Sequence, residues 1–297
     1  PDLWAPLADR WTLQDYVARR YVANMVAISE AARSAGAPCI VVPPVANAAG
    51  YAPLAPAPAQ RDTAAQEAVA DLLAARPGDA CEAEFRALRR LAQHDAATMW
   101  QAAEAWAACP PEVRWGLYAR AVQWDTLPLR SDRSLRDALA AARGWRAALQ
   151  AHAVLDAATV NADPGLANRY FVDHCHFTWQ GNAKVAERLL PRVLEALGVD
   201  PATAAGAAPT GGALRRALGY SPGHAYNAAR AVLDAQAKAP FRDRMNYEAW
   251  KVLWARRQQA AARDINPFAL APFIAAQERR AQRTEDWETH RNLAQLY

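Results

Sequence analysis

Apolar side chains recur every three or four residues between positions 12 and 35, and this spacing predicts an amphipathic helix. Gly36 follows, and a glycine in this place is typical of a helix end. The next segment, "PCIVVPPV" at 38–45, is apolar at almost every position. A short unbroken apolar run rich in Ile and Val is typical of a strand buried on both faces of a parallel sheet.

The hydrophobic pattern becomes purely helical from about residue 62. Breaks at "RPGD", "QHD" and "CPP" divide it into four predicted helices, at roughly 62–75, 80–92, 95–108 and 110–123. Small residues alternate with aromatic ones at helical spacing, which resembles the packing of tetratricopeptide hairpins. We therefore expect a helical insertion over 61–124. Its core is expected to hold four tryptophans: Trp100, Trp106, Trp115 and Trp124.

The second half of the chain offers one more strand candidate and several helices. "HAVLDAATV" contains an apolar run that predicts a strand at about 153–159. A helix is expected at about 180–197, a linker at 200–212 and a helical extension at 213–297. Two strands do not make a stable parallel sheet, so further strands are expected elsewhere in this chain or outside it.

Composition and charge narrow the class of protein only slightly. Charged residues make up 22% of the chain, which is ordinary for a globular protein, and no apolar stretch is long enough to predict a membrane span. The N-terminus lacks the features of a signal peptide, and a start at Pro1 suggests that an upstream segment was removed or omitted. The net charge of +4 is spread over helix faces without a basic and aromatic stripe, so we expect no nucleic-acid partner.

The four cysteines do not form a C-x-x-C pair, which makes a zinc ribbon or a thioredoxin motif unexpected. Cys81 and Cys109 fall in predicted helices and are able to approach each other. Free buried thiols are the default expectation for all four, and a disulfide between these two remains open.

The segment "FVDHCHFTWQGNAKVAERLL" at 171–190 carries the clearest candidate chemistry. Asp173 and His176 are three residues apart on a predicted turn that precedes a helix. At this spacing a carboxylate and an imidazole are able to hydrogen-bond, which fixes the histidine tautomer that accepts a proton from a hydroxyl nucleophile.

This segment resembles the last conserved block of the SGNH (GDSL-type) hydrolases, in which an Asp-x-x-His pair precedes a Gly and a helix. The order of the other segments is similar to that of bacterial members with a tetratricopeptide-like insertion. The resemblance implies a three-layer α/β/α fold with a flavodoxin-like parallel sheet, incomplete in this chain, built from 1–60 and 125–199. It implies His176 as the general base, Asp173 as the residue that orients it, and no metal or organic cofactor.

The same resemblance exposes a missing nucleophile. The family's serine lies in an N-terminal Gly-Asp-Ser block, and this chain contains no Gly-Asp-Ser. We therefore expect the serine and the oxyanion donors to come from an N-terminal segment or a companion chain. The implied reaction is hydrolysis or transfer of an ester-linked acyl group through an acyl-serine intermediate.

Two other motifs offer alternatives. "GYSPG" at 219–223 matches the nucleophile elbow of α/β-hydrolases, but Pro222 lacks the N–H that an oxyanion hole needs there, and Ser221 as a helix N-cap explains the same residues. "DHCH" at 173–176 contains only metal-ligand types, but neighbouring side chains on a turn are expected to point in different directions.

Two further residues are candidate substrate contacts. Asn47 follows the first predicted strand, where ligands of open α/β sheets bind, although an asparagine that caps a loop is an alternative. Arg130 in "LPLRSD" is a candidate anchor for an anionic substrate group or a clamp for its own loop.

A non-catalytic function stays open beside the enzyme hypothesis. The helical hairpins and the Arg- and Trp-rich C-terminal helices would then form a scaffold that holds a partner protein. The bacterial cell envelope is favoured as the location, by analogy alone.

Overall fold

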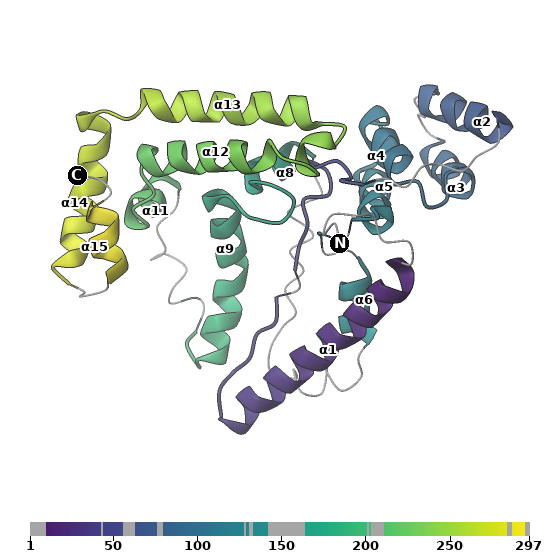
Figure 1. The fold of residues 1–297 in the computed structure, drawn as a ribbon. Coiled ribbons are helices and arrows are strands. Elements are labelled where there is room, and N and C mark those ends of the chain that lie inside the picture. Colours follow the sequence, from purple (N-terminus) through teal and green to yellow (C-terminus); the bar gives the residue numbers. More distant parts are fainter. Residues whose placement is uncertain are drawn as a thin grey trace. The chain divides into compact units, whose positions relative to one another are not determined.

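The computed structural model describes residues 10–42, 44–55, 63–75, 80–127, 129–130, 133–141, 164–200, 202, 211–283 and 287–294. Contacts divide the chain into two compact units, Pro1–Val199 and Asp200–Tyr297. The division falls where the sequence analysis places the start of the linker. Each unit is described by itself below (Figure 1).

The first unit is built from helices whose ends carry local signals. Asp95 and Thr178 act as side-chain N-caps, and Pro111 occupies the first position of its helix. The helices are α1 (Arg10–Ser34), α2 (Thr63–Ala74), α3 (Cys81–Leu91), α4 (Ala96–Ala105), α5 (Pro111–Trp124), α6 (Arg133–Ala141), α8 (Pro164–Tyr170) and α9 (Trp179–Ala196).

Helices α2 to α5 form two hairpins that share one core. α2 packs on α3 and α4 packs on α5, and the pairs meet through α2–α4 and α3–α5. The tryptophans expected in this core are buried at Trp100, Trp106 and Trp124, while Trp115 is partly buried against it. Four alanines from the 46–52 segment enter the same core: Ala46, Ala48, Ala49 and Ala52.

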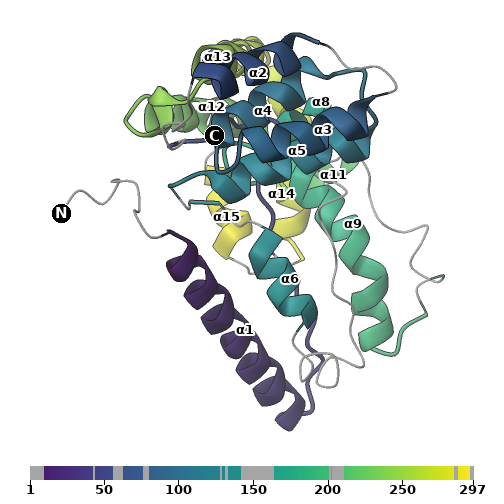
Figure 2. The same ribbon diagram turned by 90° about the vertical axis from the view of Figure 1, so that its right-hand side faces the viewer.

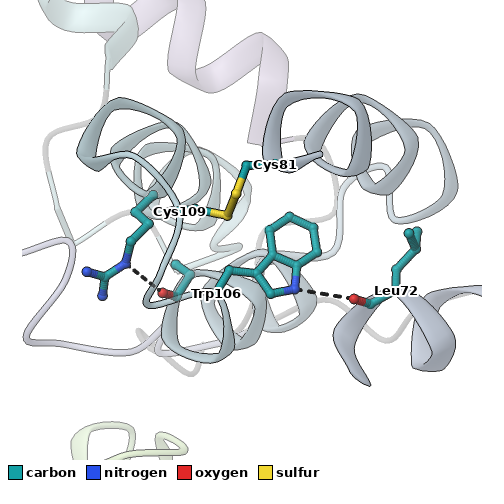
Figure 3. The surroundings of a disulfide bond; sticks show 6 residues. Leu72, Cys81, Trp106 and Cys109 are labelled. Atoms are coloured by element: carbon teal, nitrogen blue, oxygen red, sulfur yellow. Dashed lines mark hydrogen bonds between the residues drawn. A yellow bond between two sulfur atoms is a disulfide. The ribbon is translucent and has the colours of Figure 1, made fainter. Parts of the chain in front are cut away.

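A disulfide between Cys81 and Cys109 joins the start of α3 to the loop between α4 and α5 (Figure 3). Beside it, the indole N–H of Trp106 donates a hydrogen bond to the carbonyl of Leu72, which ties α2 to the same cluster. Free thiols, the default expectation for these two cysteines, are therefore wrong. The other two cysteines, Cys39 and Cys175, are free thiols.

The apolar run at 38–45 does not form the predicted strand. Its described residues belong to no helix or strand, and Val41 packs with Leu139 of α6 and with side chains of α1, among them Tyr21 and Met25. Helices α1 and α6 lie side by side in both ribbon views (Figures 1 and 2). Two helices thus bury the apolar run that was expected to lie in a sheet. Hydrophobic periodicity alone does not distinguish burial by helices from burial in a sheet.

The predicted α/β fold is consequently wrong for the described part of the chain. These residues contain helices and no β-strand, and an isolated bridge joins Phe171 to Phe177 across a turn. The strand predicted at 153–159 lies outside the described residues. The three-layer flavodoxin-like sheet that the resemblance implied is replaced by helical packing.

The second unit is also helical. Ser221 caps α12, accepting a hydrogen bond from the His224 N–H, and Pro222 occupies the first helical position, as the N-cap explanation requires. α12 and α13 form a hairpin, and no helix in the described ranges is both long and apolar enough to cross a bilayer. The elements are α11 (Gly211–Ala217), α12 (Pro222–Gln236), the 3-10 turn η2 (Phe241–Asp243), α13 (Tyr247–Arg263), α14 (Pro267–Ala281) and α15 (Trp287–Ala294).

Removing the disulfide is expected to destabilise the first unit. The cysteines are 28 residues apart, and the chain-entropy relation for that loop length gives about 3.6 kcal/mol. A double Cys81→Ala/Cys109→Ala variant should lower the free energy of unfolding by about 2–4 kcal/mol in urea titrations. The matched Cys39→Ala variant, which removes a free thiol, should cost less. An unchanged urea midpoint in the double variant would contradict a stabilising disulfide.

Candidate functional site

The candidate site is the tight turn that joins α8 to α9 in the first unit (Figure 1). The Val172 N–H donates to the His176 carbonyl at 2.8 Å, and the Thr178 N–H donates to the Tyr170 carbonyl at 2.9 Å. The rings of Phe171 and Phe177 meet below the turn, with centroids 4.8 Å apart. These contacts close the turn at both ends and fix the backbone between them.

Within the turn, Asp173 and His176 form a hydrogen-bonded pair. Nδ1 of His176 lies 2.8 Å from Oδ2 of Asp173, and the backbone N–H groups of Cys175 and His176 donate to Oδ1 at 2.9 Å each. The Asp173 side chain is 14% exposed, whereas the His176 ring is 72% exposed. When Nδ1 carries the proton and donates it to the carboxylate, Nε2 is left as a base that faces solvent.

The carboxyl of Asp173 is held in its charged form. Burial by itself would raise its pKa, but the backbone N–H bonds from Cys175 and His176, with the nearby His174 and His176 rings, outweigh burial and keep the pKa below its usual range. An ionised carboxylate on Nδ1 fixes the ring orientation and stabilises the imidazolium that forms when Nε2 accepts a proton.

Gly181 is required where α9 begins. A Cβ at this position would lie 2.2 Å from the Tyr170 carbonyl oxygen and 2.9 Å from the ring of Phe177. The first turn of α9, capped by the Thr178 hydroxyl, therefore packs directly on the end of α8. This close approach gives a physical reason for the glycine in the 171–190 motif.

Asn47 fixes the other side of the turn. Its backbone N–H donates to the His174 carbonyl at 2.9 Å, and its side-chain amide donates to the Asp173 carbonyl at 3.0 Å. Its Oδ1 accepts from the Gly50 N–H at 2.9 Å, in a space that a Cβ on Gly50 would invade at 2.8 Å. Asn47 is buried, and it thereby joins the 46–52 segment to the backbone of the turn between α8 and α9.

Arg130 and Asp125 hold that segment in place. Arg130 donates to the carbonyls of Tyr51 and Asn47 at 2.6 and 3.3 Å, and to Oδ2 of Asp125 at 2.8 Å. Asp125 in turn accepts the backbone N–H groups of Leu54 and Ala55. Both charged side chains are almost fully buried, at 2% and 1% exposure, so the pair organises the loop instead of facing solvent.

The structure therefore brings all four residues proposed from the sequence into one region. Asp173 and His176 are in direct contact, Asn47 bonds the backbone behind them, and Arg130 bonds the backbone of Asn47. The polar groups of Asn47 and Arg130 described here bind protein atoms, and their substrate contacts stay predictions. Sequence analysis missed Asp125; its signal, a lone acid directly after the apolar helix "YARAVQW", is weak.

The same turn also gathers metal-ligand atoms. One ligand atom each from Asp173, His174 and Cys175 lies within 4.8 Å of the others. The expectation that neighbouring side chains on this turn point in different directions is wrong for these three. Burial, and then the charge of Asp173, raise the pKa of the Cys175 thiol to about 11.

The comparisons with known proteins add no relative: no family model, no curated protein and no solved structure matches this chain. Function has to be argued from the turn itself.

Breaking the buried ion pair should be costly. Arg130→Met leaves the Asp125 carboxylate and the Tyr51 carbonyl without their buried donor, and we expect a loss of about 3–5 kcal/mol in the free energy of unfolding. Denaturant titration measures this loss. Arg86→Met, which removes an arginine of α3 whose side chain is 62% exposed, is the matched control and should cost less than about 1 kcal/mol. Equal losses in the two variants would show that the pair contributes nothing special.

Proposed function

We propose that Asp173 and His176 are the acid-base pair of an enzyme that hydrolyses or transfers an ester-linked acyl group. The observation that supports this is the 2.8 Å contact between His176 Nδ1 and a partly buried, ionised carboxylate, while the His176 ring is 72% exposed. A structural histidine would be expected to bury its ring, whereas a general base must present one nitrogen to an incoming hydroxyl.

The proton path follows from this geometry. His176 Nε2 takes the proton of a hydroxyl nucleophile as the oxygen attacks the ester carbonyl carbon, and Asp173 stabilises the resulting imidazolium. The imidazolium then gives the proton to the departing alkoxide as the ester bond breaks. Water repeats the sequence on the acyl intermediate and releases the carboxylic acid.

The pair of Asp173 and His176 needs a hydroxyl nucleophile to act on. We propose a serine supplied by a further segment or by a companion chain, together with the donors that stabilise the tetrahedral oxyanion. The turn is suited to act on such a group because its backbone is fixed from behind by Asn47 while His176 faces outward.

Two variants test the pair in an ester hydrolysis assay. Asp173→Asn keeps an oxygen for the backbone N–H groups but offers an N–H to Nδ1, which places the ring proton on Nε2 and removes the base. We expect Asp173→Asn and His176→Ala to lower kcat/KM by about 100- to 10,000-fold. The assay uses p-nitrophenyl acetate and the protein as it occurs naturally, with any further segment or companion chain present.

His224→Ala is the matched control, because His224 also makes a short side-chain contact, Nδ1 to the Ser221 hydroxyl at 2.9 Å, but lies in the second unit. This variant should keep the activity, which also corrects for the slow reaction of imidazoles with the ester. Turnover that stays the same in His176→Ala, or that is absent in the unaltered protein, would refute the proposal.

The scaffold alternative is favoured by one observation in the second unit. Phe268 at the start of α14 is 91% exposed and Trp287 at the start of α15 is 69% exposed, so both aromatic side chains are accessible to a partner protein. A scaffold predicts background turnover in every variant, so the same assay separates the two functions.

A further inference from the structure

We propose that Asp173, His174 and Cys175 form a binding site for a thiophilic divalent cation of the zinc class. The evidence is the convergence of one oxygen, one nitrogen and one sulfur ligand atom, all within 4.8 Å of one another, on three successive residues. A cation placed among them would complete its shell with solvent, in the manner of open three-ligand zinc sites.

The backbone of the turn explains why three neighbouring side chains converge. The Cys175 N–H donates to the Asp173 carboxylate at 2.9 Å, and this bond folds the chain back so that the carboxylate and the thiol lie on the same side. Asn47 holds the carbonyls of Asp173 and His174 from the opposite side, so the backbone is fixed before any ion arrives. The Tyr51 ring packs beside the His174 imidazole, with centroids 5.7 Å apart.

The mixture of ligand types selects the kind of cation. Magnesium and calcium prefer shells of oxygen atoms, whereas a thiolate with an imidazole and a carboxylate suits zinc and its softer neighbours. On binding, the Cys175 S–H bond breaks, the proton leaves to solvent, and the freed electron pair forms the sulfur–metal bond.

Cobalt(II) reports the sulfur ligand directly. We expect the chelator-treated protein to bind one Co²⁺, with a near-ultraviolet thiolate-to-metal charge-transfer band. Cys175→Ser should abolish this band, and Cys39→Ser, the matched variant of the other free thiol, should leave it intact. Asp173→Asn and His174→Ala should each weaken binding by at least about tenfold.

Three results would overturn the site: no band at saturating Co²⁺, a band that survives Cys175→Ser, or a band that requires Cys39. Circular dichroism of each variant checks that the fold is retained. Zn²⁺ should displace Co²⁺, while a large excess of Mg²⁺ should not, and displacement by Mg²⁺ would refute the assigned class of cation.

A functional consequence rests on the proposed hydrolase activity. Asp173 belongs both to the cation site and to the pair with His176, so bound Zn²⁺ should inhibit ester hydrolysis, and a chelator should restore it. The two hypotheses fail separately. A cobalt band without any esterase activity would support the cation site alone, and activity that Zn²⁺ leaves unchanged, with no cobalt band, would support the hydrolase alone.

Discussion

The buried ion pair of Asp125 and Arg130 is the contact on which the candidate site depends. The segment from 46 to 55 is buried but belongs to no helix or strand among the described residues, so its backbone groups need partners from side chains. Asp125 accepts the N–H groups of Leu54 and Ala55, and Arg130 donates to the Tyr51 carbonyl. Each charge thus satisfies the loop as well as its partner, which offsets the cost of removing both from water.

Side chains of this loop connect it both to the core of the hairpins and to the turn between α8 and α9. Alanines at 46, 48, 49 and 52 are small enough to let the backbone enter the core between the helical hairpins. Asn47, which lies between them in sequence, binds the backbone of the turn between α8 and α9. A buried loop therefore connects the core of the hairpins to the site. The disulfide between Cys81 and Cys109 belongs to the same core.

Local signals in the sequence were sufficient for the long helices, though not for the short α8, and for the contact between Asp173 and His176. Helix periodicity and capping are properties of neighbouring residues, and so is the three-residue spacing of Asp173 and His176. The prediction of a strand at 38–45 was wrong because an apolar run predicts burial without specifying what buries it. Here α1 and α6 bury the run. The structural role of Asp125 was missed for a related reason. Its partners, Leu54 and Ala55, are about seventy residues away in the sequence, and no local pattern predicts a contact at that separation.

The Asp173 carboxylate sets a limit on what this turn does at one time. Oδ1 accepts two backbone N–H groups, from Cys175 and His176, and Oδ2 lies closest to Nδ1 of His176. Nδ1 of His176 also lies 3.0 Å from Oδ1, so the ring contacts both carboxylate oxygens. A cation bound to this carboxylate would draw electron density from the oxygens that His176 contacts, and its positive charge would oppose a second positive charge on the imidazole. The two proposed uses of this carboxylate, proton transfer at His176 and cation binding at Asp173, would therefore oppose each other.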